Sequence, residues 1–411
     1  MISRYVLKSK DKILITFDFE SKIKEINGIN SSCYSISNII INQDNRKLLP
    51  KNLTDISEKS LLEWVKKRKA PKNRQFVEKI LAAYNDNSSP FAYVDVCKAL
   101  SVNDTYWIDN EEFQQKWEDV NLYAHPFDDI LAYVAFTGYS RKVTGVLSSP
   151  EPTTYGKQKK CWSNRENGIY LLKGASDWLN RGGCSDVYSE FYASQIAEAM
   201  GFNHVEYKLE IFKHKNREKE LISVCKAFTT ADVGYIPFYY VLKEKGIAYN
   251  RDLSDYEFQL QLGEVFGSNA FEDMMLFDSI IYNADRHMNN FGMLVDNNTG
   301  EIIGSAPLFD HGLSLLVGAA SSDLASHESI KEYRNSLISK FDISFDEQAY
   351  RFVQQRHLKA LKSLCSFKLK PPADYEYNKD YLKILNAVIN ERAKEIIEFC
   401  HEKLVKKQKV L

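Results

Sequence analysis

Three side chains whose chemistry suits phosphoryl transfer lie between Asn283 and Leu315. The run N-A-D-R-H-M-N-N-F-G-M-L-V-D contains Asp285 and Asn290, and A-P-L-F-D-H-G-L-S-L contains Asp310. Phosphoryl transfer needs a carboxylate to orient or deprotonate the acceptor hydroxyl, and oxygen ligands to hold Mg²⁺ on the nucleotide phosphates. The D-x-x-x-x-N spacing alone is common by chance. Its combination with Asp-Arg-His, a short hairpin and a D-x-G ending is much more specific.

The elements around these residues should bring them together. The apolar segment Phe271 to Asn283 predicts a buried helix that anchors the loop carrying Asp285. Segments 291–295 and 301–304 flank Asp-Asn-Asn-Thr-Gly, which is strong hairpin chemistry. A hairpin here would carry Asn290 and Asp310 towards each other. Each residue taken singly could be an ordinary helix or turn cap, but together they indicate a metal site.

The neighbours of these residues leave alternatives open. His287 either fixes the loop by a hydrogen bond or contacts the phosphate that is transferred. We expect Arg286 to pair with a carboxylate near the loop. His311 is expected to be a packing residue rather than a ligand.

A second cluster lies upstream. A strand is expected at Asn167 to Gly174. Lys173 is the last residue on its otherwise apolar face, and an ammonium group there needs an anionic partner. The helix expected at Asp186 to Met200 carries Glu190 on the same stripe as its alanines, where a carboxylate is costly unless paired. A Lys173–Glu190 ion pair would give each of these charges its partner. In kinases such a pair positions the α- and β-phosphates. The alternative is a surface lysine and a helix-edge glutamate that never meet.

Two further segments could contact a nucleotide. Gly156 lies in the polar, basic loop P-T-T-Y-G-K-Q-K-K, and a glycine there can bring backbone N–H groups close to phosphates. The same loop could simply be flexible. Residues 221–230 predict a strand that runs out into a connector with Lys226 and Phe228, where a kinase hinge would meet adenine. A plain edge strand is the alternative.

Composition narrows the class of protein. The 411 residues are 44% hydrophobic, and 54 Lys and Arg against 55 Asp and Glu give a net charge of −1, so no overall field favours nucleic acid or a membrane. The seven cysteines are scattered without a C-x-x-C pair, which disfavours a zinc site or disulfide framework. No signal peptide or membrane-length apolar run is seen. A cytoplasmic location fits best, although secretion by a non-classical route stays open.

The N-terminal region predicts a mixed α/β unit. Residues 12–20 and 22–29 are expected to form two paired strands, and Glu58 to Lys69 a helix that Pro71 stops. A second helix is expected over residues 74–84. The basic turn from Lys66 to Arg74 is either a solvated helix end or a docking patch for an acidic partner or nucleic acid. The final helix is expected near residues 379–407.

At this point the sequence resembles the HipA-like kinase family, especially its CtkA-type branch. The similarity is carried by W-V-K-K-R-K-A-P-K-N-R, L-S-V-N-D-T-Y-W-I and the Asp285 motif, and by G-K-Q-K-K, which is similar to the family's G-x-Q-x-K phosphate loop. The resemblance implies that Gly156, Gln158 and Lys160 contact phosphate. Thr153 falls where the family has an autophosphorylated serine, so Thr153 and Thr154 are candidate sites. Asp-Arg-His is also similar to phosphatidylinositol kinases.

The resemblance implies an α+β, two-lobed protein-kinase-like fold with a small β-rich lobe and a larger helical lobe. We expect an N-terminal HipA-type subdomain over residues 1–145, a nucleotide-binding lobe over 146–235 and a helical catalytic lobe over 236–411. The implied roles are catalytic base for Asp285, Mg²⁺ ligands for Asn290 and Asp310, and a phosphate contact for Lys173.

The expected activity is that of an ATP- and Mg²⁺-dependent serine/threonine protein kinase that phosphorylates itself. The alternatives are a lipid or small-molecule kinase and a non-catalytic nucleotide-binding regulator. The expected partners are a protein substrate and an inhibitory antitoxin-like protein, and no nucleic-acid contact is indicated. The sequence names neither the substrate nor the oligomeric state.

Overall fold

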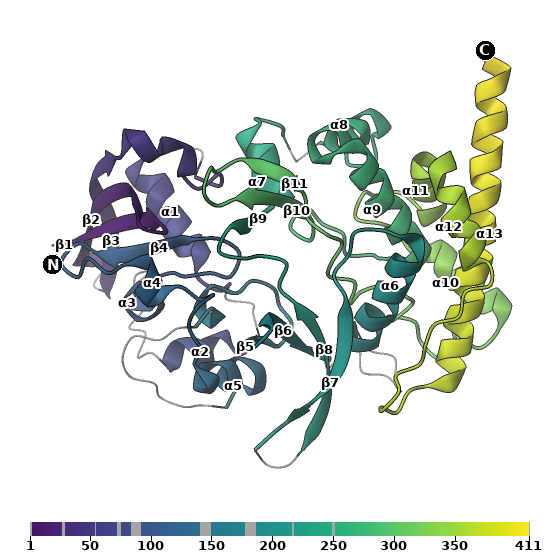
Figure 1. Ribbon diagram of the computed structural model, residues 1–411, viewed down its shortest axis with the longest axis horizontal. Coiled ribbons are helices and arrows are strands. Elements are labelled where there is room, and N and C mark those ends of the chain that lie inside the picture. Colours follow the sequence, from purple (N-terminus) through teal and green to yellow (C-terminus); the bar gives the residue numbers. More distant parts are fainter. Residues whose placement is uncertain are drawn as a thin grey trace.

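The computed structural model describes residues 2–26, 29–53, 55–71, 75–83, 92–139, 149–176, 186–215, 218–248 and 251–410. These residues form three antiparallel sheets and a mainly helical C-terminal part (Figure 1). The strands are β1 (Ile2–Ser9), β2 (Lys12–Ile26), β3 (Ile29–Ile41), β4 (Tyr106–Asn110), β5 (Lys160–Arg165), β6 (Gly168–Gly174), β7 (Tyr207–Lys213), β8 (Lys219–Lys226), β9 (Val233–Pro237), β10 (Gly292–Asp296) and β11 (Ile302–Ser305).

The helices differ widely in length. They are α1 (Glu58–Arg68), α2 (Val77–Ala82), α3 (Ala92–Cys97), α4 (Trp117–Val120), α5 (Asp129–Thr137), α6 (Asp186–Met200), α7 (Phe238–Glu244), α8 (Tyr256–Phe266), α9 (Ser268–Ile281), α10 (His327–Ser336), α11 (Phe345–Phe352), α12 (Leu358–Leu364) and α13 (Lys379–Val410). Short 3₁₀ turns lie at Gln43–Leu48, Glu151–Thr153 and Gln355–His357. Among the described residues, no helix combines the length and apolar character that crossing a membrane requires.

The N-terminal sheet has the strand order β3-β2-β1-β4 and packs against α1. The prediction of two paired strands within residues 12–29 is wrong, because β2 runs unbroken from Lys12 to Ile26. Its partners are β1 and β3, and the residues at the supposed break include no glycine or proline that would turn the chain. The predicted helix from Glu58 is confirmed, and Ser57 caps its first turn.

The connection between α1 and α2 contacts the segment before β5. Ala70 donates its backbone N–H to the Pro152 carbonyl at 2.6 Å, and Gln75 donates its own to the Lys157 carbonyl at 2.9 Å. The Gln75 side chain then accepts from the Lys159 backbone N–H at 3.1 Å. The N-terminal unit therefore holds the backbone of the glycine loop on both sides of Gln158.

The predicted basic turn is not uniformly solvated. Arg68 is buried, and its guanidinium binds both carboxylate oxygens of Asp104 at 2.6 and 2.9 Å. Lys66 pairs with Glu63 on the helix surface. Lys72 and Arg74 lie outside the described residues.

The middle sheet has the order β5-β6-β8-β7 and sets up the candidate site. Lys160 on β5 lies opposite Lys173 on β6, which lies opposite Ser223 on β8. Residues directly opposite on antiparallel strands point to the same face, so these three side chains form one row. The other face packs through Leu172, Val224 and their neighbours against α5.

The C-terminal part supplies the largest hydrophobic core. The side chains of α9 are buried almost all round, and α6, α11, α12 and α13 pack in the same core. The predicted hairpin is confirmed as β10 and β11, and β9 adds a third strand beside β10. Figure 1 shows α13 along the outer edge of this part, far from the N-terminal sheet. Because its side chains are packed in this core, α9 is a firm support for the loop that follows it.

Candidate active site

The first half of the site is a buried ion network centred on Lys173. Its ammonium group lies 2.5 Å from Glu190 Oε1 and 2.8 Å from Asp310 Oδ1. Ser223 donates its hydroxyl to the other oxygen of Glu190 at 2.6 Å. Lys173 and Glu190 are 5% and 1% exposed, whereas the Asp310 side chain is 36% exposed. The expected Lys173–Glu190 pair is confirmed, and it extends directly to Asp310.

Burial and charge act in opposite directions on these groups. Burial disfavours the ammonium form of Lys173, but the carboxylates of Asp310 and Glu190 outweigh it and raise the pKa of Lys173 well above its ordinary value. Burial also opposes ionisation of Asp310, yet the neighbouring Lys173 charge lowers the pKa of that carboxyl. Burial raises the pKa of Glu190 despite Lys173. Lys173 and Asp310 are therefore both charged at neutral pH.

The second half is the loop after α9, which Arg286 fixes in place. The α9 helix ends at Ile281, and the next residue, Tyr282, has a φ of 54° that turns the chain out of the helix. Arg286 then points back inward and binds both oxygens of Asp278 at 2.9 and 3.0 Å. The same guanidinium donates to the carbonyls of Asn290 at 2.7 Å and Phe309 at 2.6 Å. The expected pairing of Arg286 with a carboxylate is confirmed, and this residue joins the two loops that carry Asn290 and Asp310.

Asp285 and Asn290 lie at the two ends of this loop. Asn290 donates its side-chain amide to the Asp285 carbonyl at 2.9 Å. The Asp285 carboxylate is 34% exposed, and Lys340 Nζ lies 3.9 Å from its Oδ1. Burial raises the pKa of Asp285, and Asp310 adds to the effect, while His287, Lys340 and Arg286 oppose it. Asp285 is therefore a more basic carboxylate than Asp310, which lies close enough to interact with it.

The donor set of Asn290 and Asp310 fits Mg²⁺. The nitrogen of the Asn290 amide is used by the Asp285 carbonyl, so its oxygen is the atom left for a cation. Asp310 adds a carboxylate that stays ionised and partly exposed. Within the described residues no group of three or more His, Cys, Asp or Glu side chains could hold a metal alone. Mg²⁺ bound to nucleotide phosphates needs only one or two protein carboxylates, because phosphate and water oxygens complete its shell.

The glycine loop is only partly placed as the resemblance implies. Gly156 has a φ of +97°, and a Cβ there would come within 2.2 Å of Lys160 Nζ, so Lys160 lies across the glycine. Lys160 also faces Lys173 and is one of the cations that lower the pKa of Asp310. Gln158 instead donates its amide to the Gly174 carbonyl at 2.7 Å and to Asp186 Oδ2 at 2.8 Å. Gln158 therefore fastens the loop to the start of α6.

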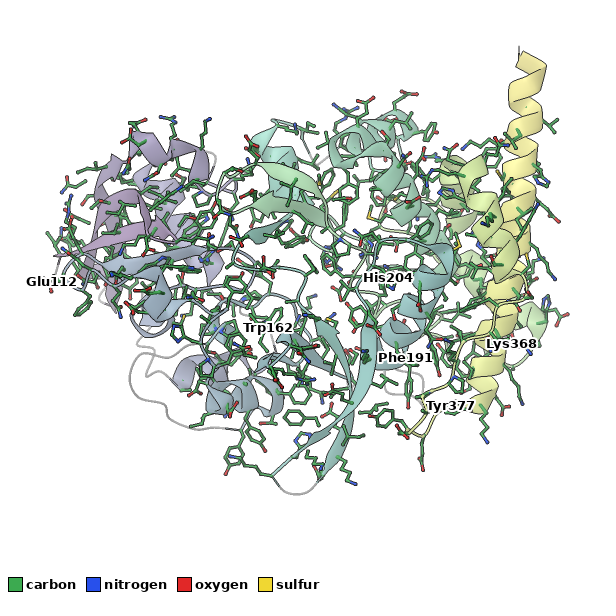
Figure 2. The ribbon with its side chains drawn as sticks, viewed as in Figure 1. Glu112, Trp162, Phe191, His204, Lys368 and Tyr377 are labelled. Carbon is green, nitrogen blue, oxygen red and sulfur yellow. The ribbon has the colours of Figure 1, made fainter. Side chains whose placement is uncertain are left out.

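The two candidate phosphorylation sites are inside the protein. Thr153 is 3% exposed and donates its hydroxyl to the Leu100 carbonyl at 2.6 Å. Thr154 donates to the Pro150 carbonyl at 2.7 Å and accepts from the indole N–H of Trp162 at 2.9 Å. Trp162, labelled in Figure 2, comes from β5 beside the loop. Neither hydroxyl can be reached as a phosphoryl acceptor in this conformation.

The remaining candidates fall in different places. Lys226 is exposed and lies opposite Tyr170, on the face of the sheet that points away from Lys173. Phe228 packs against Phe309, the residue that precedes Asp310, and their ring centroids lie 5.5 Å apart. His287 is exposed, and its Nδ1 accepts from the Asn289 backbone N–H at 3.2 Å. The structure thus brings Phe228 and His287 near the site and leaves Lys226 outside it.

Three residues at the site were missed by the sequence interpretation. Ser223 interrupts the apolar run of β8 with its one hydroxyl side chain. Pairing β8 with β6 would have placed this hydroxyl beside Lys173. Tyr207 accepts the Asp310 backbone N–H at 3.1 Å, and Lys340 approaches Asp285. The last two lie far along the chain from their partners, and no local pattern marks them. His311 is a packing residue as expected: it is fully buried, its ring meets Phe277, and burial lowers its pKa well below the ordinary value.

Comparison with known proteins agrees with this architecture. No family model and no curated protein matches the sequence. The chain superposes on HipA of Shewanella oneidensis, solved with HipB and operator DNA, at a TM-score of 0.50 and 11% identity over 97% of this chain and 98% of that one. It is also similar to the proinflammatory kinase CtkA of Helicobacter pylori, with a TM-score of 0.46 and 20% identity over 61% of this chain and 95% of that chain. From end to end, the protein has the kinase-like fold of HipA.

Proposed function

We propose that the protein transfers the γ-phosphoryl group of Mg²⁺-ATP to serine or threonine hydroxyls of a protein. The observation that carries the proposal is the Lys173 bridge between Glu190 and Asp310. A lysine held by two carboxylates beside a loop with an available base is the arrangement that phosphoryl transfer requires. The HipA-like fold supports the reaction class, and the acceptor is inferred from that likeness.

Each residue has a defined task in this proposal. Lys173 would bind phosphate oxygens, and Glu190 would hold its ammonium in place. Mg²⁺, held by Asn290 and Asp310, would neutralise charge on the phosphates. Asp285 would accept the proton of the acceptor hydroxyl, because its raised pKa makes it the better base of the two loop aspartates.

The acceptor and the partner are inferred from the exposure of Asp285 and from the likeness to HipA. The Asp285 carboxylate is a third exposed, which lets a side chain of another protein reach it. A lipid or small-molecule acceptor uses the same catalytic groups and is the competing proposal. The HipA structure contains HipB, so we propose an antitoxin-like protein as an inhibitory partner. Autophosphorylation at Thr153 or Thr154 would require this buried segment to open first.

The test is incubation of the purified protein with γ-labelled ATP, Mg²⁺ and a cell lysate. We expect label on serine or threonine of protein, and loss of that label in Asp285→Asn and Asp310→Asn. Asparagine is preferred to alanine at position 310, where φ is 60°, because it tolerates the left-handed region. Asp380→Asn is the matched control, because Asp380 is an exposed carboxylate on α13. Mass spectrometry of the protein itself reports on Thr153 and Thr154.

Other outcomes separate the alternatives. Label recovered only in the lipid or small-molecule extract would support those acceptors. Nucleotide binding without any transfer would support a regulator. Transfer that survives in Asp285→Asn would contradict the assigned base.

A further inference from the structure

The loop that carries Asp285 offers no available lysine or arginine to the acceptor side of the site. The loop D-R-H-M-N-N contains one arginine, Arg286, which is 2% exposed and committed to Asp278 and two backbone carbonyls. Lys173 is held on the nucleotide side by Glu190 and Asp310. In phosphoryl transfer, negative charge spreads over the equatorial oxygens of the moving group, and positive groups on both sides stabilise it.

Lys340 is the cation that reaches this position. Its ammonium lies 3.9 Å from Asp285 Oδ1, and its side chain is 49% exposed. Among the ion pairs of the described ranges, this is the one that involves Asp285. A separation of 3.9 Å is longer than a charge-assisted hydrogen bond, so the ammonium can rotate towards another anion without breaking a tight contact.

The backbone of Lys340 is held in place although its side chain is half exposed. Lys340 lies in a tight turn in which the Ser339 N–H donates to the Ile343 carbonyl at 3.0 Å, and the Asp342 N–H donates to the Ser339 carbonyl at 3.0 Å. The following residue, Phe341, is buried, and its ring packs edge-to-face on Phe271 of α9 at 6.0 Å. The turn and the loop that carries Asp285 are therefore anchored on the same helix.

A structural reason for the Lys340–Asp285 pair is weak. Half-exposed ion pairs contribute little to folding because water screens both charges. The turn is already held by its own backbone hydrogen bonds and by Phe341. A charged side chain that the fold does not need, pointed at the expected base, suggests a role in the reaction.

We infer that Lys340 is a catalytic residue whose ammonium group binds the phosphoryl group as it passes from ATP to the acceptor hydroxyl. The inference rests on the proposed function. In that step the acceptor oxygen forms a bond to the γ-phosphorus and its proton goes to Asp285. The bond from the γ-phosphorus to the β,γ-bridging oxygen breaks, and its electron pair stays on ADP. Lys340 remains protonated throughout and supplies charge only.

The kinetic test compares three variants. Lys340→Met should lower kcat by about 10²–10³-fold, the usual loss when one donor to a developing charge is removed. The KM for ATP should rise by a smaller factor than kcat falls, because the contact to the γ-phosphate of bound ATP strengthens as charge develops during transfer. Lys340→Arg should recover part of the rate. Lys331→Met is the matched control, since Lys331 is an exposed lysine on α10, and it should behave as wild type. A wild-type kcat in Lys340→Met would overturn the inference.

A second measurement does not depend on turnover. The full-length protein is treated briefly with an acetylating reagent, and modification of Lys340 and Lys331 is quantified by mass spectrometry. Mg²⁺ with a β,γ-imido ATP analogue should slow acetylation of Lys340 more than Mg²⁺ with ADP does, while Lys331 is unaffected. Equal acetylation of Lys340 in both states would refute the contact. If the wild type transfers no phosphate, the proposed function fails on its own, and the labelling result still decides whether Lys340 meets the γ-phosphate.

Discussion

The two halves of the site are built in opposite ways. At the proposed nucleotide end, Lys173 and Glu190 are buried and held by Ser223 and Asp310. At the proposed acceptor end, Asp285 and Lys340 are a third and a half exposed and lie 3.9 Å apart. One half is a closed network whose charges depend on one another. The other is an open pair whose members can be changed separately.

This difference indicates where the fold and the reaction are coupled. Burying two charges costs free energy of hydration, which only the attraction between the charges offsets. Removing one of them leaves the other buried without a partner and destabilises the protein. An exposed pair contributes little to folding, so its residues can serve the reaction alone. Variants at the nucleotide end should lose stability and activity together, whereas variants at the acceptor end should lose activity with little loss of stability.

The largest expected effect comes from deleting the central cation. Lys173→Met leaves Glu190 buried without its ammonium partner and should lower the free energy of unfolding by about 3–5 kcal/mol. Lys340→Met is the comparison at the open end and should cost less than about 1 kcal/mol. Urea unfolding followed by tryptophan fluorescence measures both. Equal losses in the two variants would remove the distinction between the halves.

A smaller loss is expected from the hydroxyl that supports Glu190. Ser223→Ala removes a hydrogen bond to a buried carboxylate and should cost about 1.5–3 kcal/mol. The same change should raise the KM for ATP, because Glu190 then holds Lys173 less firmly. Ser336→Ala, on the exposed side of α10, is a control that should change neither quantity. A stable Ser223→Ala protein with an unchanged KM would show that Glu190 needs no second partner.

The dependence of stability on pH should have opposite signs at the two aspartates. Folding lowers the pKa of Asp310, so its ionised form stabilises the protein above about pH 4, and this contribution is lost as the pH falls through the lowered folded pKa. Folding raises the pKa of Asp285, so its ionisation opposes folding and its protonation in acid favours it. Asp310→Asn should therefore shrink the stability difference between about pH 7 and pH 3.

Asp285→Asn should enlarge the stability difference between about pH 7 and pH 3, because it removes a carboxyl whose protonation in acid favours folding. Urea unfolding over the pH range measures both variants against wild type. A change of the same sign in the two variants would contradict the assigned pKa directions.

The smallest effect should come from the contact between the N-terminal unit and the glycine loop. Gln75→Ala removes the acceptor of the Lys159 N–H and should weaken nucleotide binding by less than about tenfold, the value of one neutral hydrogen bond. Titration with a fluorescent ATP analogue measures the affinity. Gln115→Ala is the control, because Gln115 lies in the same unit and bonds to Lys8 and Asp109 through its backbone. An unchanged affinity in Gln75→Ala would mean that the N-terminal unit does not help to shape the phosphate end.

Local patterns account for the elements that the sequence predicts correctly. The helix predicted at Asp186 to Met200 has those bounds in the structure, and Gly201 follows it with a φ of +72°, as a helix-ending glycine does. The β10–β11 hairpin follows from its turn residues in the same way. The Lys173–Glu190 pair was predictable because a buried charge requires a partner, which is a physical demand rather than a local pattern.

Long-range geometry accounts for what was missed. No sequence pattern joins Lys340 to Asp285 or Tyr207 to Asp310, because a packed core creates those contacts. Lys226 was misplaced because strand alternation turns it to the far face of the sheet. The N-terminal strands were divided wrongly because β1, which pairs with β2, was not recognised. The catalytic roles of the site residues stay predictions until transfer is measured.

The alignment of Lys160, Lys173 and Ser223 across three strands has a consequence for related sequences. Successive strand residues alternate between faces, so gaining or losing a single residue within β5, β6 or β8 would turn the rest of that strand over. Genes that keep this chemistry should therefore show no insertions or deletions across residues 160–165, 168–174 and 219–226, whatever happens to side-chain identity elsewhere. Length variation should accumulate instead outside these strands, for example between Lys213 and Lys219, the last paired residues of β7 and β8.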